Sequence, residues 1–135
     1  MSKIDCKLFP TEEVFRITGV KPSPECPRFK GLSRDSLGEL IDIGVVSLDD
    51  EFNNCPSVGK MLRHANNADI TFEGYIVGPP REDCRVTVDG YTMTIAGRDD
   101  ARLSRDYWDF TDYEPDERDI IELPDNRFSV RLWWD

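Results

Sequence analysis

The sequence predicts an α+β fold in a single domain, with a mostly antiparallel sheet of four to six strands and two or three short helices. Three observations predict this class. Residues 36–67 combine capping signals with helical spacing of apolar residues, residues 69–135 carry strand-like patterns, and prolines crowd residues 1–35. A chain of 135 residues has the length of one domain, which buries roughly two-thirds of its unfolded surface.

Residues 1–35 are expected to form an irregular, proline-rich segment that covers the domain. Four of the nine prolines fall there: Pro10, Pro22, Pro24 and Pro27. Because proline lacks a backbone N–H, the stretch KPSPECP excludes a helix and a central strand. Ahead of it, Thr11 is expected to cap a short helix that runs through Ile17 and ends at Gly19. A strand is the alternative there, because valine, phenylalanine and isoleucine favour strands.

The helical part, residues 36–67, contains two capping signals. Ser36 and Glu39 have the spacing of a capping box, and the apolar face that follows stops at Gly44. Ser57 is expected to cap a second helix after Pro56. The apolar stripe of this helix consists of Val58, Met61, Leu62 and Ala65.

The sheet part, residues 69–135, is expected to contain two hairpins. Asp89-Gly90 is a preferred two-residue hairpin turn, and it would pair Val88 with Tyr91 and Val86 with Met93 on one apolar face. A second hairpin is predicted near the C-terminus, where DIIEL and RFSVRLWW flank a turn at Pro124-Asp125-Asn126.

Charge excludes several functions. Seventeen basic and twenty-seven acidic side chains give a formal net charge of −10. Phosphate contacts need clustered Lys and Arg, so direct binding to nucleic acid or to an anionic membrane is not expected. Self-association would have to overcome the same charge, so we expect a monomer or a weak homo-oligomer that rests on an apolar patch.

The sequence predicts a cytoplasmic protein. No apolar run has the length of a membrane span, and MSKIDCKLF lacks the hydrophobic core of a signal peptide. The four cysteines are far apart, without a C-x-x-C pair, and are expected to be packed thiols in a reducing compartment. No metal site is expected, because zinc sites usually show paired close spacings.

The sequence contains no complete catalytic or cofactor motif, so no catalytic residue and no cofactor is assigned. Gly59-Lys60 fails as a phosphate loop, because no glycine lies five positions earlier and Met61 replaces the required Ser or Thr. The acidic stretch from Asp49 fails as a calcium loop, because Lys60 stands where a bidentate glutamate belongs. His64, the one histidine, has no nucleophile at a recognisable spacing. An interaction protein is therefore favoured over an enzyme.

The last strand indicates an alternative function, a small-molecule-binding protein or small enzyme with a pocket between sheet and helices. Alternation places Phe128, Val130, Leu132 and Trp134 on the core face and Arg127, Ser129, Arg131 and Trp133 on the other. A tryptophan beside two arginines can stack a ligand, and Arg81 in the loop at Gly78–Arg81 is a further candidate. We expect instead that the proline-rich segment covers Trp133, since large rings prefer burial.

The stretch DYWDFTDYEPDE, residues 106–117, interleaves six carboxylates with four aromatic rings and contains no Lys or Arg. Such a surface can hold a basic partner, with charges that steer it and rings that anchor it; a solvated loop is the alternative. The candidate partner-binding residues are Asp106, Tyr107, Trp108, Asp109, Asp112, Tyr113 and Glu114. In size and charge the chain resembles the small acidic α+β proteins that include many bacterial toxin-immunity proteins, which implies an interaction module of immunity or inhibitor type that docks a basic protein.

Overall fold

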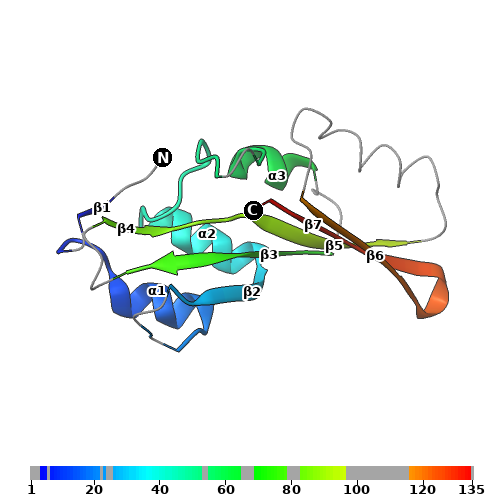
Figure 1. The fold of residues 1–135 in the computed structure, drawn as a ribbon, viewed down its shortest axis with the longest axis horizontal. Helices are drawn as coiled ribbons and strands as arrows, with labels where there is room; N and C mark the ends of the chain where they lie inside the picture. The colour runs from blue at the N-terminus through cyan, green and yellow to red at the C-terminus, as the bar shows by residue number, and fades with distance from the viewer. Residues whose placement is uncertain are drawn as a thin grey trace.

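The computed structural model describes residues 4–5, 7–21, 23, 26–52, 55–64, 69–78, 83–96 and 116–134. They form the predicted single α+β domain, in which every strand pairing is antiparallel. Figure 1 shows the long sheet running across the molecule. The strands are β1 (Ile4–Asp5), β2 (Arg28–Ser33), β3 (Asp69–Val77), β4 (Asp83–Val86), β5 (Gly90–Ala96), β6 (Glu117–Leu123) and β7 (Arg127–Trp133).

The strand order is β1-β4-β3-β5-β7-β6, and β2 also pairs with β3. Thr71 and Phe72 of β3 pair with both β2 and β5, so these two strands lie on opposite edges of β3. β4 and β5 follow one another along the same edge of β3. Counted with β4 and β5 as one continuous strand, the sheet has six strands, which agrees with the predicted four to six.

Three α-helices accompany the sheet, as predicted: α1 (Thr11–Thr18), α2 (Arg34–Asp42) and α3 (Val58–His64). α1 ends at Gly19, whose φ of 71° only glycine adopts readily. Its N-cap is Pro10 and not the predicted Thr11. α2 also starts earlier than predicted, because Ser33 and not Ser36 caps it, accepting a hydrogen bond from the Ser36 N–H. Ser57 accepts the Lys60 N–H at the start of α3, as expected.

Strand β2 was not predicted. It lies inside residues 1–35, which the sequence indicated to be irregular, and it pairs with β3 immediately after Pro27. Its register shifts between Phe29 and Leu32, and Gly31 at this shift has a φ of 67°. This irregularity breaks the alternation of polar and apolar residues that identifies a strand in sequence.

The hairpin predicted at Asp89-Gly90 is wrong. β4 and β5 do not pair with each other; both pair with β3. From Ile76↔Val86 to Glu73↔Gly90, β3 advances three residues while the opposite chain advances four. The extra residue makes a β-bulge in one continuous edge, residues 83–96.

Close approach explains the glycine at the bulge. A Cβ on Gly90 would lie 2.6 Å from the Leu132 carbonyl oxygen, and a Cβ on Gly74 would lie 1.9 Å from that of Thr87. Gly90 has no positive φ, whereas the predicted type I′ turn would need one. The Asp-Gly pair therefore serves packing between strands and not chain reversal.

The C-terminal hairpin is confirmed. β6 and β7 pair from Glu117↔Trp133 to Leu123↔Arg127, and the 3₁₀ turn η2 (Pro124–Asn126) joins them. Asp125 and Asn126 adopt positive φ values of 64° and 56°, which aspartate and asparagine tolerate better than most residues.

One hydrophobic core lies between the helices and one face of the sheet. α1 and α2 pack against each other, and α2 packs on β2 and β3. The fully buried side chains that the sheet contributes to this face include Phe72, Ile76, Tyr91, Leu132 and Trp134. Trp134 stacks on Tyr91, with ring centroids 6.1 Å apart. We call this the helix-facing side and the other the open face.

The cysteine prediction holds only in part. Cys26 and Cys55 are free thiols, whereas Cys84 is disulfide-bonded. The expectation that all four cysteines are thiols is thus wrong for Cys84, whose bonding partner lies outside the described residues.

Candidate functional site

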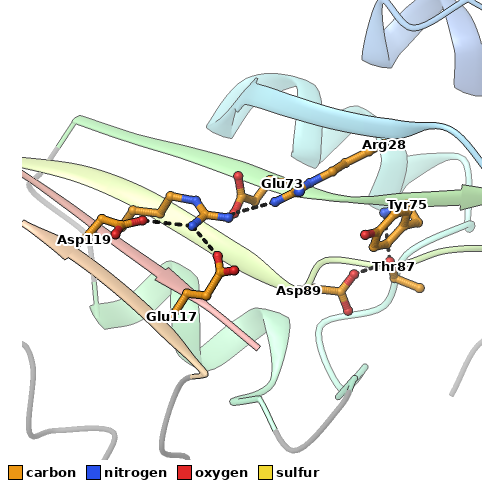
Figure 2. A network of polar contacts seen from close by, with 8 residues as sticks. Arg28, Glu73, Tyr75, Thr87, Asp89, Glu117 and Asp119 are labelled. Atoms are coloured by element: carbon orange, nitrogen blue, oxygen red, sulfur yellow. Dashed lines mark hydrogen bonds and ion pairs between the residues drawn. The ribbon is translucent and has the colours of Figure 1, made fainter. Parts of the chain in front are cut away.

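The open face of the sheet carries a buried carboxylate, Glu73 in the middle of β3. Only 4% of this residue is exposed. Its Oε1 atom lies 2.7 Å from a guanidinium nitrogen of Arg131 on β7 and 3.4 Å from one of Arg28 on β2. Figure 2 shows Glu73 with Arg28 reaching toward it. Two cations from separate strands thus compensate a charge that burial alone would make costly.

Arg131 extends this network to the edge strand. Its Nη1 atom donates to Glu117 at 2.8 Å and to Asp119 at 3.1 Å, both on β6 (Figure 2). Burial alone would lower the pKa of Arg131, but hydrogen bonds to Glu117, Glu73 and Asp119 and the charge of Glu73 raise it above its usual value. Arg131 therefore stays protonated and joins three strands by charge-assisted hydrogen bonds.

Trp133 lies under these arginines and is only 4% exposed. The Arg28 guanidinium lies 4.3 Å from its ring centroid and that of Arg131 lies 5.7 Å away, both within range of a cation–π interaction. Tyr75 packs edge-on against the same ring at 5.9 Å. The sequence predicted a tryptophan beside arginines. Arg28, which belongs to the segment expected to cover the ring, lies over it together with Arg131.

A second polar pair lies at the bulge. The Thr87 hydroxyl accepts the Tyr75 N–H at 2.9 Å and donates to Asp89 at 2.5 Å (Figure 2). Asp89 is 1% exposed. The bulge interrupts the regular ladder here, so a side-chain hydroxyl satisfies an amide that a backbone carbonyl would otherwise bind.

A cavity of about 370 Å³ opens beside this pair. β3 and β4 contribute lining residues that alternate with the core residues Ile76 and Val86 and so belong to the open face. The lining residues are Cys26, Glu51, Phe52, Tyr75, Val77, Arg85, Thr87 and Asp89. We call this cavity the bulge pocket.

Cys55, three residues after the pocket residue Phe52, is buried. Its thiol contacts the Val88 carbonyl at 3.7 Å and accepts the Phe52 N–H at 3.3 Å. Burial raises the pKa of Cys55 to about 12, and the charges of Asp89 and Glu51 act in the same direction. The thiol is therefore protonated at neutral pH, the less reactive form of cysteine.

The structure distributes the predicted ligand-binding residues unevenly. Arg131 and Trp133 meet as expected. Arg127 is exposed beside the C-terminal turn, where it pairs across the ladder with Leu123. Arg81 lies outside the described residues. The bulge pocket opens on the open face, whereas the sequence placed its predicted pocket between sheet and helices.

The predicted partner-binding residues, Asp106 to Glu114, lie outside the described residues. The end of the acidic stretch is described: Asp116 and Glu117 are exposed, and the Asp116 N–H donates to the Trp133 carbonyl at 2.8 Å. Glu117 begins β6 and binds Arg131.

Three polar residues of the open face were missed: Arg28, Glu73 and Asp89. A signal existed for Glu73, because a lone carboxylate inside the β-rich run ITFEGYIV demands a buried partner. Asp89 was hidden by its assignment to a turn, and Arg28 by its assignment to the irregular segment.

Within the described part of the chain, no three His, Cys, Asp or Glu side chains are placed to hold a metal ion. None of its helices has the length and apolar character needed to cross a bilayer. Searches with the chain matched no family model, no curated protein and no solved structure.

Proposed function

We propose that this protein is an interaction module of immunity or inhibitor type that docks a basic protein through an acidic surface. The observation that supports it best is strand β6. Among the described residues β6 pairs only with β7, so its outer edge has no strand partner there. Exposed carboxylates follow this strand and its flanks: Asp116, Glu117, Asp119, Glu122 and Asp125.

Apolar side chains accompany these charges. Ile120 is 49% exposed and Ile121 58% exposed, in a sheet whose other strands bury most of their large apolar residues. An edge strand with exposed apolar residues offers backbone hydrogen bonds and an anchor to a partner chain. The surrounding carboxylates would favour a partner rich in Lys and Arg and raise its rate of association at low salt.

The acidic stretch adjoins this edge in sequence. Residues 106–115, directly before β6, add Asp106, Asp109, Asp112 and Glu114 to the charge. Glu117 and Asp119 already bind Arg131, yet each side chain remains 56% exposed and can accept a further cation. The mechanism is occlusion: carboxylates cover the basic surface with which a partner, such as a nuclease, binds phosphates.

Native mass spectrometry on protein isolated gently from its own host tests the proposal. We expect a stoichiometric basic protein that dissociates as salt increases. The variant D106N/D109N/D112N/E114Q should lose this partner. The control E12Q/E13Q/E39Q/D42N makes the same change in charge at exposed positions of α1 and α2, and should keep it.

The outcomes separate the alternatives. Equal loss in both variants would indicate attraction by net charge alone and contradict a defined docking surface. A bare monomer in every preparation would leave the acidic stretch as a solvated loop and overturn the proposal.

The cytoplasmic location remains part of this proposal, although the disulfide at Cys84 counts against it. Disulfides are uncommon in a reducing cytosol, so the redox state of Cys84 in protein alkylated during lysis tests it. A free thiol at Cys84 would support the location, and an intact bridge would contradict it.

A further inference from the structure

The bulge pocket has features that the docking of a basic protein does not use. It lies at the bulge between β4 and β5, and its lining comes from β3, β4, the bulge and the segments around Cys26 and Glu51. A volume of about 370 Å³ is at the small end of the range for ligand sites in proteins. A cavity of this size fits a small organic molecule rather than a peptide or a segment of a partner protein.

The charge of the lining is negative. Glu51 and Asp89 supply two carboxylates, against one guanidinium from Arg85. Both carboxylates also raise the pKa of the Cys55 thiol, after the larger effect of burial. Asp89 is held rigidly, since it is 1% exposed and accepts the Thr87 hydroxyl. A positively charged group is the complement of this lining.

The remaining walls are aromatic and apolar. Two aromatic residues, Tyr75 and Phe52, and the aliphatic Val77 belong to the lining. Tyr75 is fixed by its contact with Trp133 and by the hydrogen bond from its N–H to Thr87. A cation over an aromatic face gains from the ring quadrupole, and an apolar substituent gains from contact with Phe52 and Val77.

We propose that the bulge pocket binds a small organic cation: a primary amine attached to an apolar or aromatic group. The ammonium donates to Asp89 and Glu51 beside the Tyr75 ring, and the apolar part lies against Phe52 and Val77. Asp89 supplies the buried, fixed contact, and the more exposed Glu51 adds attraction at the pocket mouth.

Titration of the ¹⁵N-labelled protein with 2-phenylethylamine tests the site by NMR. We expect shifts concentrated on the amides of Tyr75, Val77, Thr87 and Asp89. The neutral analogue 2-phenylethanol and the anion 3-phenylpropionate should shift the same amides at least about tenfold less at equal concentration, because neither supplies a cation to the carboxylates.

Two variants tie binding to the carboxylates. Glu51→Gln should weaken 2-phenylethylamine binding by roughly 1.5- to fivefold, the usual range for an exposed ion pair. Asp49→Asn is the matched control: it removes one exposed carboxylate two residues away that does not line the pocket, and binding should not change. Asp89→Asn should weaken binding by about tenfold or more. Glu51→Gln decides the case if Asp89→Asn fails to fold.

Three results would overturn the proposal. The first is equal shifts from the alcohol or the anion. The second is equal weakening by Glu51→Gln and Asp49→Asn. The third is the absence of shifts at the bulge with 20 mM amine. Each result is independent of whether a basic protein docks at β6, which the native mass spectra report separately.

Discussion

Phe72 and Glu73 are neighbours on β3, yet one side chain enters the hydrophobic core and the other enters an ion-pair network. The two faces of this sheet are buried in different ways. On the helix-facing side, rings and aliphatic side chains from β3, β5 and β7 pack against the helices. On the open face, arginine side chains cover Trp133 and Glu73 in place of a helix.

The comparison shows two routes to burial with different sensitivities. Apolar packing depends on volume, so its loss grows with the cavity that a substitution leaves. A charge network depends on balance, so removing one member leaves its partners buried and unpaired. The next predictions measure each route and the bulge that separates the network from the pocket.

The largest loss of stability is expected on the helix-facing side. Trp134→Ala removes a fully buried ring that stacks on Tyr91, and should lower the free energy of unfolding by about 3–5 kcal/mol. Urea unfolding followed by circular dichroism measures it. Leu48→Ala, at an apolar residue that is 49% exposed, is the control and should cost less than about 1 kcal/mol. Similar values for both would contradict the assignment of Trp134 to the core.

Gly74→Ala should be nearly as costly, because the added Cβ would meet the Thr87 carbonyl oxygen at 1.9 Å. Backbone must move for the methyl group to fit, and we expect a loss of about 2–3 kcal/mol. Gly38→Ala is the matched control inside α2, where a Cβ meets nothing within 4 Å. It should stabilise the protein by about 0.5–1 kcal/mol. If Gly74→Ala leaves the free energy of unfolding in urea unchanged, the backbone at the bulge can move at little cost, which contradicts this prediction.

The open face is tested by Glu73→Gln, which keeps the shape of the side chain and removes its charge. Arg28 and Arg131 would lose their shared counter-ion, and we expect a loss of about 2–3 kcal/mol, reduced from the fully buried case because both arginines are partly exposed. Glu117→Gln, at a carboxylate that is 56% exposed, should cost under about 1 kcal/mol. Urea unfolding at pH 7 measures both variants. If Glu73→Gln and Glu117→Gln lower the free energy of unfolding equally, the burial of Glu73 does not increase the cost of breaking its ion pairs.

Sequence patterns predicted the helix-facing side better than the open face. Alternation along β7 correctly assigned Val130 and Trp134 to the core, because core positions of a strand need only apolar residues and these recur at every second position. Glu73 and Arg28 lie 45 positions apart, and no local pattern records that they meet. Asp89-Gly90 shows the same limit: its local preference predicts a turn, and the crowding by Leu132 and Trp133 that makes it a bulge comes from β7.

The smallest effect is expected at Cys55, whose buried thiol contacts the backbone of Val88 and Phe52. In a Cys26→Ser variant at pH 8, a disulfide reagent such as DTNB should reach Cys55 only on unfolding.

Because the pKa of Cys55 in the folded state is raised from 9.0 to about 12, the native state holds a proton that the unfolded state releases across this range. The contribution of Cys55 to the free energy of unfolding is therefore fully present below pH 9 and is lost as the pH rises toward 12. Cys55→Ala should flatten the decline in urea midpoint between pH 8 and 10 relative to Cys26→Ser alone. An unchanged slope would mean that burial does not raise the pKa of Cys55 in the folded protein, and would contradict the placement of this thiol in the interior.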